Sequence, residues 1–141
     1  MIFPVLFLTL RYGIDSNVLI RYLTQDDPEQ SQKATQCLEQ NCTVDNPGHV
    51  AHIVLCEVVW ILKKAYGYSK AEILKALQLI LSTAEFSIES PSIAWEALRQ
   101  YSVGSADFSD YLIGHLSRFY GCVTTVTFDR EAGKSNNFQL L

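Results

Sequence analysis

Carboxylates at the ends of predicted elements are the residues of this chain best suited to chemistry. One apolar run ends in Asp15, and another ends in Asp129. Asp107 and Asp110 lie three residues apart near a predicted helix start, and Glu57 interrupts an otherwise apolar helix. Neighbouring carboxylates oppose one another's ionisation, so a cluster of them needs a cation, and oxygen ligands select Mg²⁺ or Mn²⁺. One or two such ions, about 4 Å apart, hold a phosphodiester and activate a water molecule.

Two of these acids are predicted to lie at one edge of a sheet. The apolar residues 6–14 predict a first strand, and Ser16 at once begins a helix, so the strand delivers Asp15. The β-branched residues 122–128 predict a late strand that delivers Asp129. Parallel strands share their carboxyl edge, where ligands bind in open α/β sheets. We therefore expect the two carboxylates to be neighbours.

The other three acids are predicted in first helical turns. A helix over 55–66 would place Glu57 in its first turn, and Asp107 and Asp110 would share one face of a later helix. Helix N-termini favour acids in any case, and a turn is an alternative explanation for Asp129 taken alone. A site is predicted only because several acids lie at ends of elements that the fold would bring to the same edge of the sheet.

The elements that would position these side chains alternate along the chain. Helices are predicted over 16–24, 28–40, 55–66, 70–81, 91–101 and from 105 or 107 to 120, and strands over 6–14, 49–54, 86–90, 122–128 and 138–141. This order is typical of the α/β class, with a central, mostly parallel sheet covered on both faces. A chain of 141 residues without repeats or linkers is expected to form a single domain, residues 1–141.

The composition excludes a disordered chain and a domain that grips nucleic acid by charge alone. The chain is 48% hydrophobic, and its formal net charge is −4. An anionic substrate stays possible. If four clustered carboxylates are neutralised by metal, the net charge of the rest of the chain is −4 + 4 = 0. The four cysteines form no C-x-x-C pair, and Cys56 and Cys122 stand among apolar residues. We expect small buried thiols of a reduced, cytoplasmic protein.

The first ten residues are apolar and include Pro4. No Lys or Arg precedes Arg11, so the charged region of a signal peptide is missing, and the stretch is too short to span a bilayer. We interpret residues 1–10 as an atypical N-terminal extension of the first strand.

Five stretches follow one another along the chain: IDSNVLIRYL (14–23), DDPEQ (26–30), LCEVVWILKKAYGYSK (55–70), ADFSDYLIGHLSRFYG (106–121) and TFDR (127–130). In this order they resemble the PIN domain, and within it the VapC-type toxins of bacterial toxin–antitoxin pairs. Together they cover nearly the whole chain after Arg11. Each stretch is modest alone, and the ordered set is specific.

The resemblance implies a three-layer α/β/α fold and endoribonuclease activity dependent on Mg²⁺ or Mn²⁺. It carries the family's catalytic and metal-binding acids over to Asp15, Glu57, Asp110 and Asp129, with Asp107 as an extra acid, and Ser16 and Asn17 as supporting residues. It also implies an RNA substrate, a cognate antitoxin and a homodimer. The extension before Arg11 departs from the family, and so does His115, which stands where a small residue is usual and which we expect to be structural.

Two alternatives stay open from the sequence. A Mg²⁺-dependent phosphatase or phosphoacceptor domain also begins with a strand-ending Asp, although it usually has a Lys at a later strand end, where Asp129 stands here. A catalytically silent binding module would have lost acids, and none is lost.

His49 and His52 would point to opposite faces of a strand, and the segment 133–135 lacks the first glycine of a phosphate-binding loop, so neither predicts a site.

Overall fold

The computed structural model describes residues 11–141, and its elements alternate as expected for the α/β class. The helices are α1 (Ser16–Thr24), α2 (Pro28–Asn41), α3 (His52–Lys64), α4 (Lys70–Ser82), α5 (Pro91–Val103) and α6 (Phe108–Phe119), with the 3-10 turn η2 (Ala132–Lys134). The strands are β1 (Gly48–Val50), β2 (Phe86–Ile88), β3 (Thr125–Thr127) and β4 (Phe138–Leu140). Within residues 11–141 no helix is both long and apolar enough to cross a membrane.

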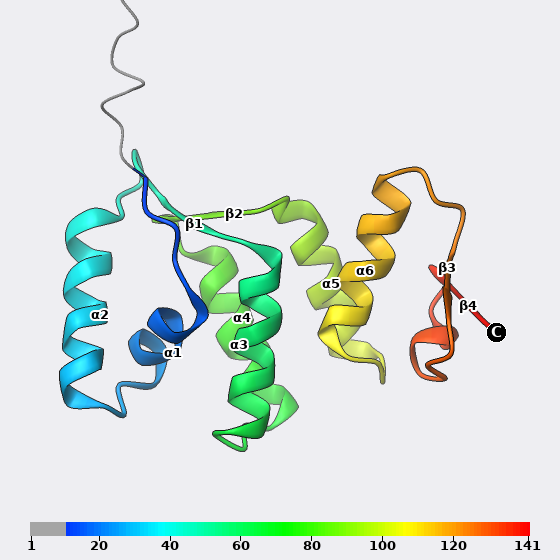
Figure 1. Cartoon of the computed structure of the whole chain (residues 1–141), viewed down its shortest axis with the longest axis horizontal. Helices are drawn as coiled ribbons and strands as arrows, with labels where there is room; N and C mark the ends of the chain where they lie inside the picture. Colours follow the sequence, from blue (N-terminus) through cyan, green and yellow to red (C-terminus); the bar gives the residue numbers. More distant parts are fainter. Residues whose placement is uncertain (1–10) are drawn as a thin grey trace, which may run out of the picture.

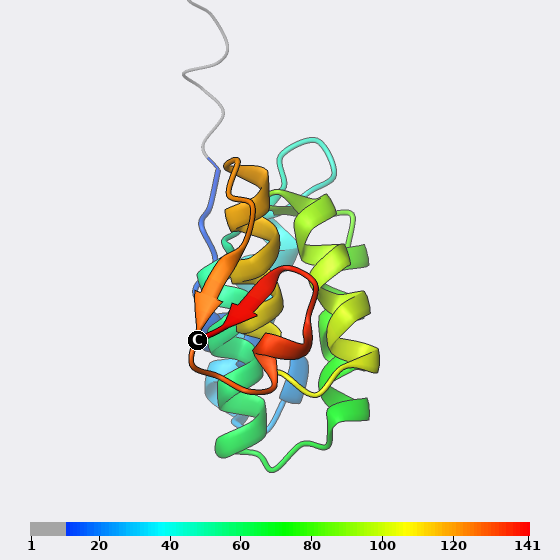
Figure 2. The same ribbon diagram turned by 90° about the vertical axis from the view of Figure 1, so that its right-hand side faces the viewer.

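The strands pair in parallel, as predicted, but in two separate sheets. β1 pairs with β2, with Gly48 opposite Phe86, and β3 pairs with β4, with Thr125 opposite Phe138. The segment before α1 adds one bridge, from Gly13 to β1. Figures 1 and 2 show the β3–β4 sheet beyond α6, at the opposite end of the molecule from α1 and α2.

Local sequence accounts for the helix boundaries. Pro28 and Pro91 occupy the first turns of α2 and α5, where a missing N–H costs nothing. Ser69 and Glu72 form a reciprocal capping box at the start of α4, as predicted. Asp15 caps α1, since its Oδ1 atom accepts a hydrogen bond from the Ser16 N–H at 2.7 Å. The acid at the end of the first apolar run therefore has a structural role of its own.

A single apolar cluster holds the helices together. α3 contributes the fully buried Leu55, Val58 and Leu62, and α4 contributes Leu77. Phe108, the first residue of α6, is 1% exposed and packs edge-to-face on Tyr101 of α5, with 5.9 Å between ring centroids. The core thereby fixes the start of α6, where two of the candidate acids lie.

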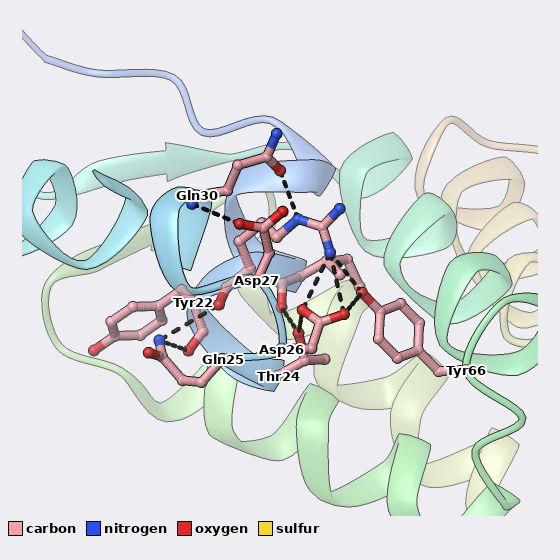
Figure 3. Close-up of polar contacts among 9 residues, drawn as sticks. Tyr22, Thr24, Gln25, Asp26, Asp27, Gln30 and Tyr66 are labelled. Carbon is pink, nitrogen blue, oxygen red and sulfur yellow. Dashed lines mark hydrogen bonds and ion pairs between the residues drawn. The ribbon is translucent and has the colours of Figure 1, made fainter. Parts of the chain in front are cut away.

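A polar network joins α1, the turn before α2 and the end of α3 (Figure 3). The Asp26 carboxylate accepts hydrogen bonds from the Thr24 hydroxyl at 2.7 Å and the Tyr66 hydroxyl at 2.8 Å. The Arg21 guanidinium donates to Asp26 at 3.1 Å and to Gln30 at 2.7 Å. The hydrogen bonds from Thr24 and Tyr66, with that of Arg21, lower the pKa of Asp26 from 3.8 to about 2. The network therefore fixes the C-terminal end of α1 against the start of α2 and the segment after α3.

The prediction of a strand over 49–54 was wrong in its second half. Strand β1 ends at Val50, and α3 begins at His52, whose N–H donates to the Glu89 carboxylate at 2.7 Å. The Val54 and Leu55 N–H groups, in the first turn of α3, donate to the Ala51 carbonyl. Helix α3 thus begins three residues earlier than predicted, which moves Glu57 from its first turn to its second.

All four cysteines are free, as expected, but their burial differs from the prediction. Cys42 is buried and Cys56 half-buried, whereas Cys37 and Cys122 are exposed. The expectation for Cys122 fails because α6 ends at Phe119 and β3 begins only at Thr125, which leaves an exposed turn between them. The predicted extension over residues 1–10 lies outside the described residues.

Candidate active site

Asp15 lies on the surface, directly after the segment that bridges to β1. Its Oδ1 atom accepts from the Ser16 backbone and approaches the Ser16 hydroxyl at 3.4 Å. Ser16 itself is buried, so it fixes the position of the carboxylate. Asn17 is exposed and lines a hollow of about 550 Å³ between α1 and α2, together with Lys33 and Cys37. The structure therefore gives Ser16, more than Asn17, the contacts of a supporting residue for Asp15.

Asp107 and Asp110 form the N-terminal end of α6. The Asp107 N–H donates to the Asp110 Oδ2 atom at 3.1 Å, and the Asp107 carboxylate lies 3.9 Å from the Lys63 ammonium of α3. Burial raises the pKa of Asp110, and the negative charges of Asp129 and Asp107 raise it further, against the Asp107 backbone hydrogen bond. These three acids therefore lie within electrostatic reach of one another.

Asp129 follows β3 and caps the turn that leads to η2. Its Oδ1 atom accepts from the Ala132 N–H at 2.8 Å, and its own N–H donates to the Thr127 hydroxyl at 2.9 Å. This is the turn role that the sequence left open for an Asp at this position. The side chain remains exposed, and its charge acts on Asp110.

Glu57 is exposed on α3 and faces a cavity that it shares with the α6 start. The cavity measures about 490 Å³, and Trp60, Lys63 and Asp107 contribute to its wall. The Glu57 charge also adds to the effect of burial on its neighbour Cys56, whose pKa rises to about 11. Glu57 and Asp107 are therefore the two candidate acids that line one concave surface.

The candidate acids form two groups in the structure. Asp107, Asp110 and Asp129 influence one another, and Glu57 joins them through the shared cavity, while Asp15 belongs to the other sheet. The expectation that Asp15 and Asp129 meet at one edge is not met. Their segments pair with different strands, and α5 and α6 lie between the two sheets (Figure 1).

The oxygen donors are those that Mg²⁺ and Mn²⁺ prefer, but their positions do not make a metal-binding cluster. Across residues 11–141 no three His, Cys, Asp or Glu side chains are placed to share an ion. The chemistry of the side chains fits a hard divalent cation. Their arrangement in this conformation does not.

Basic residues near these acids are mostly engaged with partners. Arg21 pairs with Asp26, Lys134 pairs with Glu131 at 2.9 Å, and the Arg118 Nε atom donates to Asn137 at 2.8 Å.

His115 is half-buried, and its Nε2 atom lies 3.0 Å from the Gln100 side chain. Burial lowers its pKa, as expected of a structural residue.

Sequence reasoning missed Trp60 as a surface residue. Aromatic side chains usually lie in cores or interfaces. The side chain is instead 64% exposed and lines the cavity beside Glu57. The signal was its position three residues after Glu57, which puts both on one helix face.

Comparison with known proteins identifies the fold family. Residues 12–134 match the model of the PIN domain. The chain is also 25% identical over 121 residues to the "VapC ribonuclease" of Aquifex aeolicus (strain VF5), an alignment covering 86% of this chain and 89% of that protein. The family match spans all five candidate acids and agrees with the parallel α/β architecture, so the chain belongs to the PIN domain family.

Proposed function

We propose that this protein is an endoribonuclease acting as the toxin of a toxin–antitoxin pair. The observation that carries the proposal is the PIN domain match over residues 12–134, a span that contains all five candidate acids. The similarity to a protein named VapC ribonuclease, over most of both chains, supports the same activity. RNA is then the substrate, and the reaction is hydrolysis of a phosphodiester.

The proposed catalytic carboxylates are Asp15, Glu57, Asp110 and Asp129, with Asp107 at the edge of the group. Mg²⁺ or Mn²⁺ bound to them would supply an activated water and neutralise charge on the phosphate. Burial raises the pKa of Asp110, and the charges of Asp129 and Asp107 raise it further, which supports its place in the group.

The proposal includes partners that follow from the function. A toxin that cleaves RNA needs an antitoxin that blocks its acidic cleft, and we propose a cognate protein in that role. A homodimer acting in the cytoplasm completes the proposal.

The decisive experiment measures cleavage of a structured RNA by protein purified free of antitoxin, with Mg²⁺ or Mn²⁺ and with EDTA. Asp15→Asn and Asp110→Asn should each lower the rate at least 100-fold, because each removes a carboxylate that no neighbour replaces. Asp45→Asn is the matched control, since Asp45 is exposed in the loop before β1 and belongs to neither acid group. Cleavage that persists in EDTA, or that survives both site variants, would sink the proposal. So would hydrolysis of a phosphomonoester with no action on RNA.

A further inference from the structure

Two of the segments that carry candidate acids are joined by a side-chain hydrogen bond. The Ser105 hydroxyl, in the turn between α5 and α6, donates to the Glu131 carboxylate, 26 residues along the chain. Figures 1 and 2 show this turn beside η2, which Glu131 directly precedes. Ser105 stands two residues before Asp107. Glu131 stands two residues after Asp129, so the bond links the start of α6 to the turn that follows β3.

The donor side of this bond is fixed by the residues on either side of it. The Gly104 carbonyl accepts a hydrogen bond from the Lys70 ammonium at 2.5 Å, and the same ammonium lies 4.8 Å from the centre of the Tyr101 ring. The Ala106 N–H donates to the Tyr111 hydroxyl at 3.2 Å, in a buried hydrogen bond. The backbone that presents the donor is therefore anchored to both α4 and α6.

The acceptor side is ordered as well. Ala132, the residue after Glu131, is fully buried in the apolar cluster, and its N–H donates to the Asp129 carboxylate at 2.8 Å. The Gly133 N–H donates to the Asp129 carbonyl at 2.9 Å. The Lys134 ammonium donates at 2.9 Å to the same Glu131 oxygen that accepts from the serine. A hydrogen bond between groups that are already ordered loses little side-chain entropy, which is a main cost of exposed polar contacts.

We propose that Ser105 and Glu131 are positioning residues, whose hydrogen bond holds the Asp129 turn at a fixed separation from the acids of α6. The proposal deepens the proposed ribonuclease function and rests on it for the catalytic consequence. Neither side chain belongs to the five candidate acids, so each acts through the segment that carries it. The charge of Asp129 already acts on Asp110 across this junction. Because a misplacement of about 1 Å can lower a rate up to about 100-fold, the bond affects turnover more than RNA binding.

Serine substitutions separate this positioning role from an incidental surface contact. Ser105→Ala removes the donor, and Ser105→Thr keeps a hydroxyl at the same position. Ser102→Ala is the matched control, because Ser102 is also exposed but its hydroxyl donates to the Arg99 carbonyl within α5, at 2.6 Å. Urea unfolding followed by circular dichroism verifies that each variant is folded. The midpoints should match wild type, since an exposed polar contact contributes little to global stability.

Amide hydrogen exchange gives a readout that needs no enzymatic activity. The Ala132 and Gly133 amides report on the Asp129 turn, because both donate to Asp129. Ser105→Ala should speed their exchange at least about 3-fold, since the loss of a hydrogen bond favours local opening of the turn. The Leu62 amide in the middle of the apolar cluster should exchange as in wild type. Ser105→Thr and Ser102→Ala should leave all three amides unchanged.

The kinetics of RNA cleavage give the second readout. Ser105→Ala should lower kcat about 10-fold and leave KM for RNA within about 2-fold, because a displaced carboxylate weakens interactions with the transition state. Ser105→Thr should restore kcat to within about 2-fold of wild type. Adding Glu131→Ala to Ser105→Ala should lower kcat no further than about 2-fold, because both changes remove the same bond.

Three outcomes overturn the positioning role. Unchanged exchange of the Ala132 and Gly133 amides in Ser105→Ala shows that the bond does not hold the turn. Faster exchange with unchanged kcat reduces the bond to a structural contact, and so does a kcat that Ser105→Thr fails to restore. The tests are separable from the proposed function: wild-type cleavage that Ser105→Ala leaves intact rejects the positioning role alone. Absence of cleavage by wild type rejects the nuclease, and hydrogen exchange then still decides whether the bond holds the turn.

Discussion

Replacing Phe108 with alanine should cost this fold more than any surface change on α6. The ring is 1% exposed and makes an edge-to-face contact with Tyr101. A buried phenylalanine removes about 200 Å² from water, which at ~25 cal/mol per Å² gives ~5 kcal/mol as an upper bound. Measured costs of such truncations are roughly 3–5 kcal/mol. We therefore expect a loss of about 4 kcal/mol in the free energy of unfolding, against a total of roughly 5–15 kcal/mol for a domain of this kind.

The same helix offers a matched control in Phe119→Ala. Phe119 also makes an edge-to-face contact, with Tyr120 at 5.2 Å between centroids, but it is 69% exposed. The pair therefore isolates burial from aromatic contact, and Phe119→Ala should change stability by less than about 0.5 kcal/mol. Urea unfolding followed by circular dichroism measures both, and thermal unfolding should place Phe108→Ala roughly 10 °C below wild type. Equal costs for the two variants would show that the core does not hold the start of α6 as described.

Three further predictions test the scaffold. The pKa of Asp26 is lowered from 3.8 to about 2 in the folded state, so its contribution to the free energy of unfolding is complete above pH 3.8 and is lost as pH falls towards 2. The Asp26→Asn variant should therefore lose less stability than wild type between pH 3.8 and 2 in acid unfolding. An unchanged acid-unfolding profile would contradict this reasoning. Gly114→Ala would put a methyl group 2.8 Å from the Phe138 ring, so it should cost about 1–3 kcal/mol in urea unfolding, whereas Gly13→Ala, with no atom within 4 Å of its Cβ, should not. Ser69→Ala should lower the free energy of unfolding by about 1 kcal/mol, because alanine cannot accept the hydrogen bond from the first turn of α4. Ser69→Asp should retain that stability, because aspartate can accept it. Equal losses in the two variants would refute the capping argument.

Much of the fold was predictable because its signals are local. The helix from Ser16 to Thr24 and the capping box at Ser69 follow from residues within one turn of each boundary. The parallel pairing followed from the alternation of strands and helices. The boundary at His52 was missed because it depends on a hydrogen bond to Glu89, 37 residues away, which no local pattern reveals.

The site was predictable in its members and not in its geometry. Each acid lies at or near an element end, where sequence places it, but whether two strands share a sheet depends on packing across the whole chain. Asp15 and Asp129 illustrate this limit, because both cap local structure and only long-range pairing could unite them. For Trp60, the sequence shows a spacing of three residues from Glu57, but it does not show that the side chain is exposed.

The division into two sheets also sets the order in which the chain can most easily form its strand pairs. Thr125 and Phe138 are 138 − 125 = 13 residues apart, whereas Gly48 and Phe86 are 86 − 48 = 38 apart. For a flexible chain, closing the longer loop costs about 1 kcal/mol more in conformational entropy. The C-terminal pair can therefore form from its own neighbourhood, independently of the distant strands. The Leu141 amide donates to the Thr127 carbonyl, and the Gly48 amide donates to the Glu85 carbonyl. In pulse-labelled hydrogen exchange during refolding, the Leu141 amide should become protected no later than the Gly48 amide.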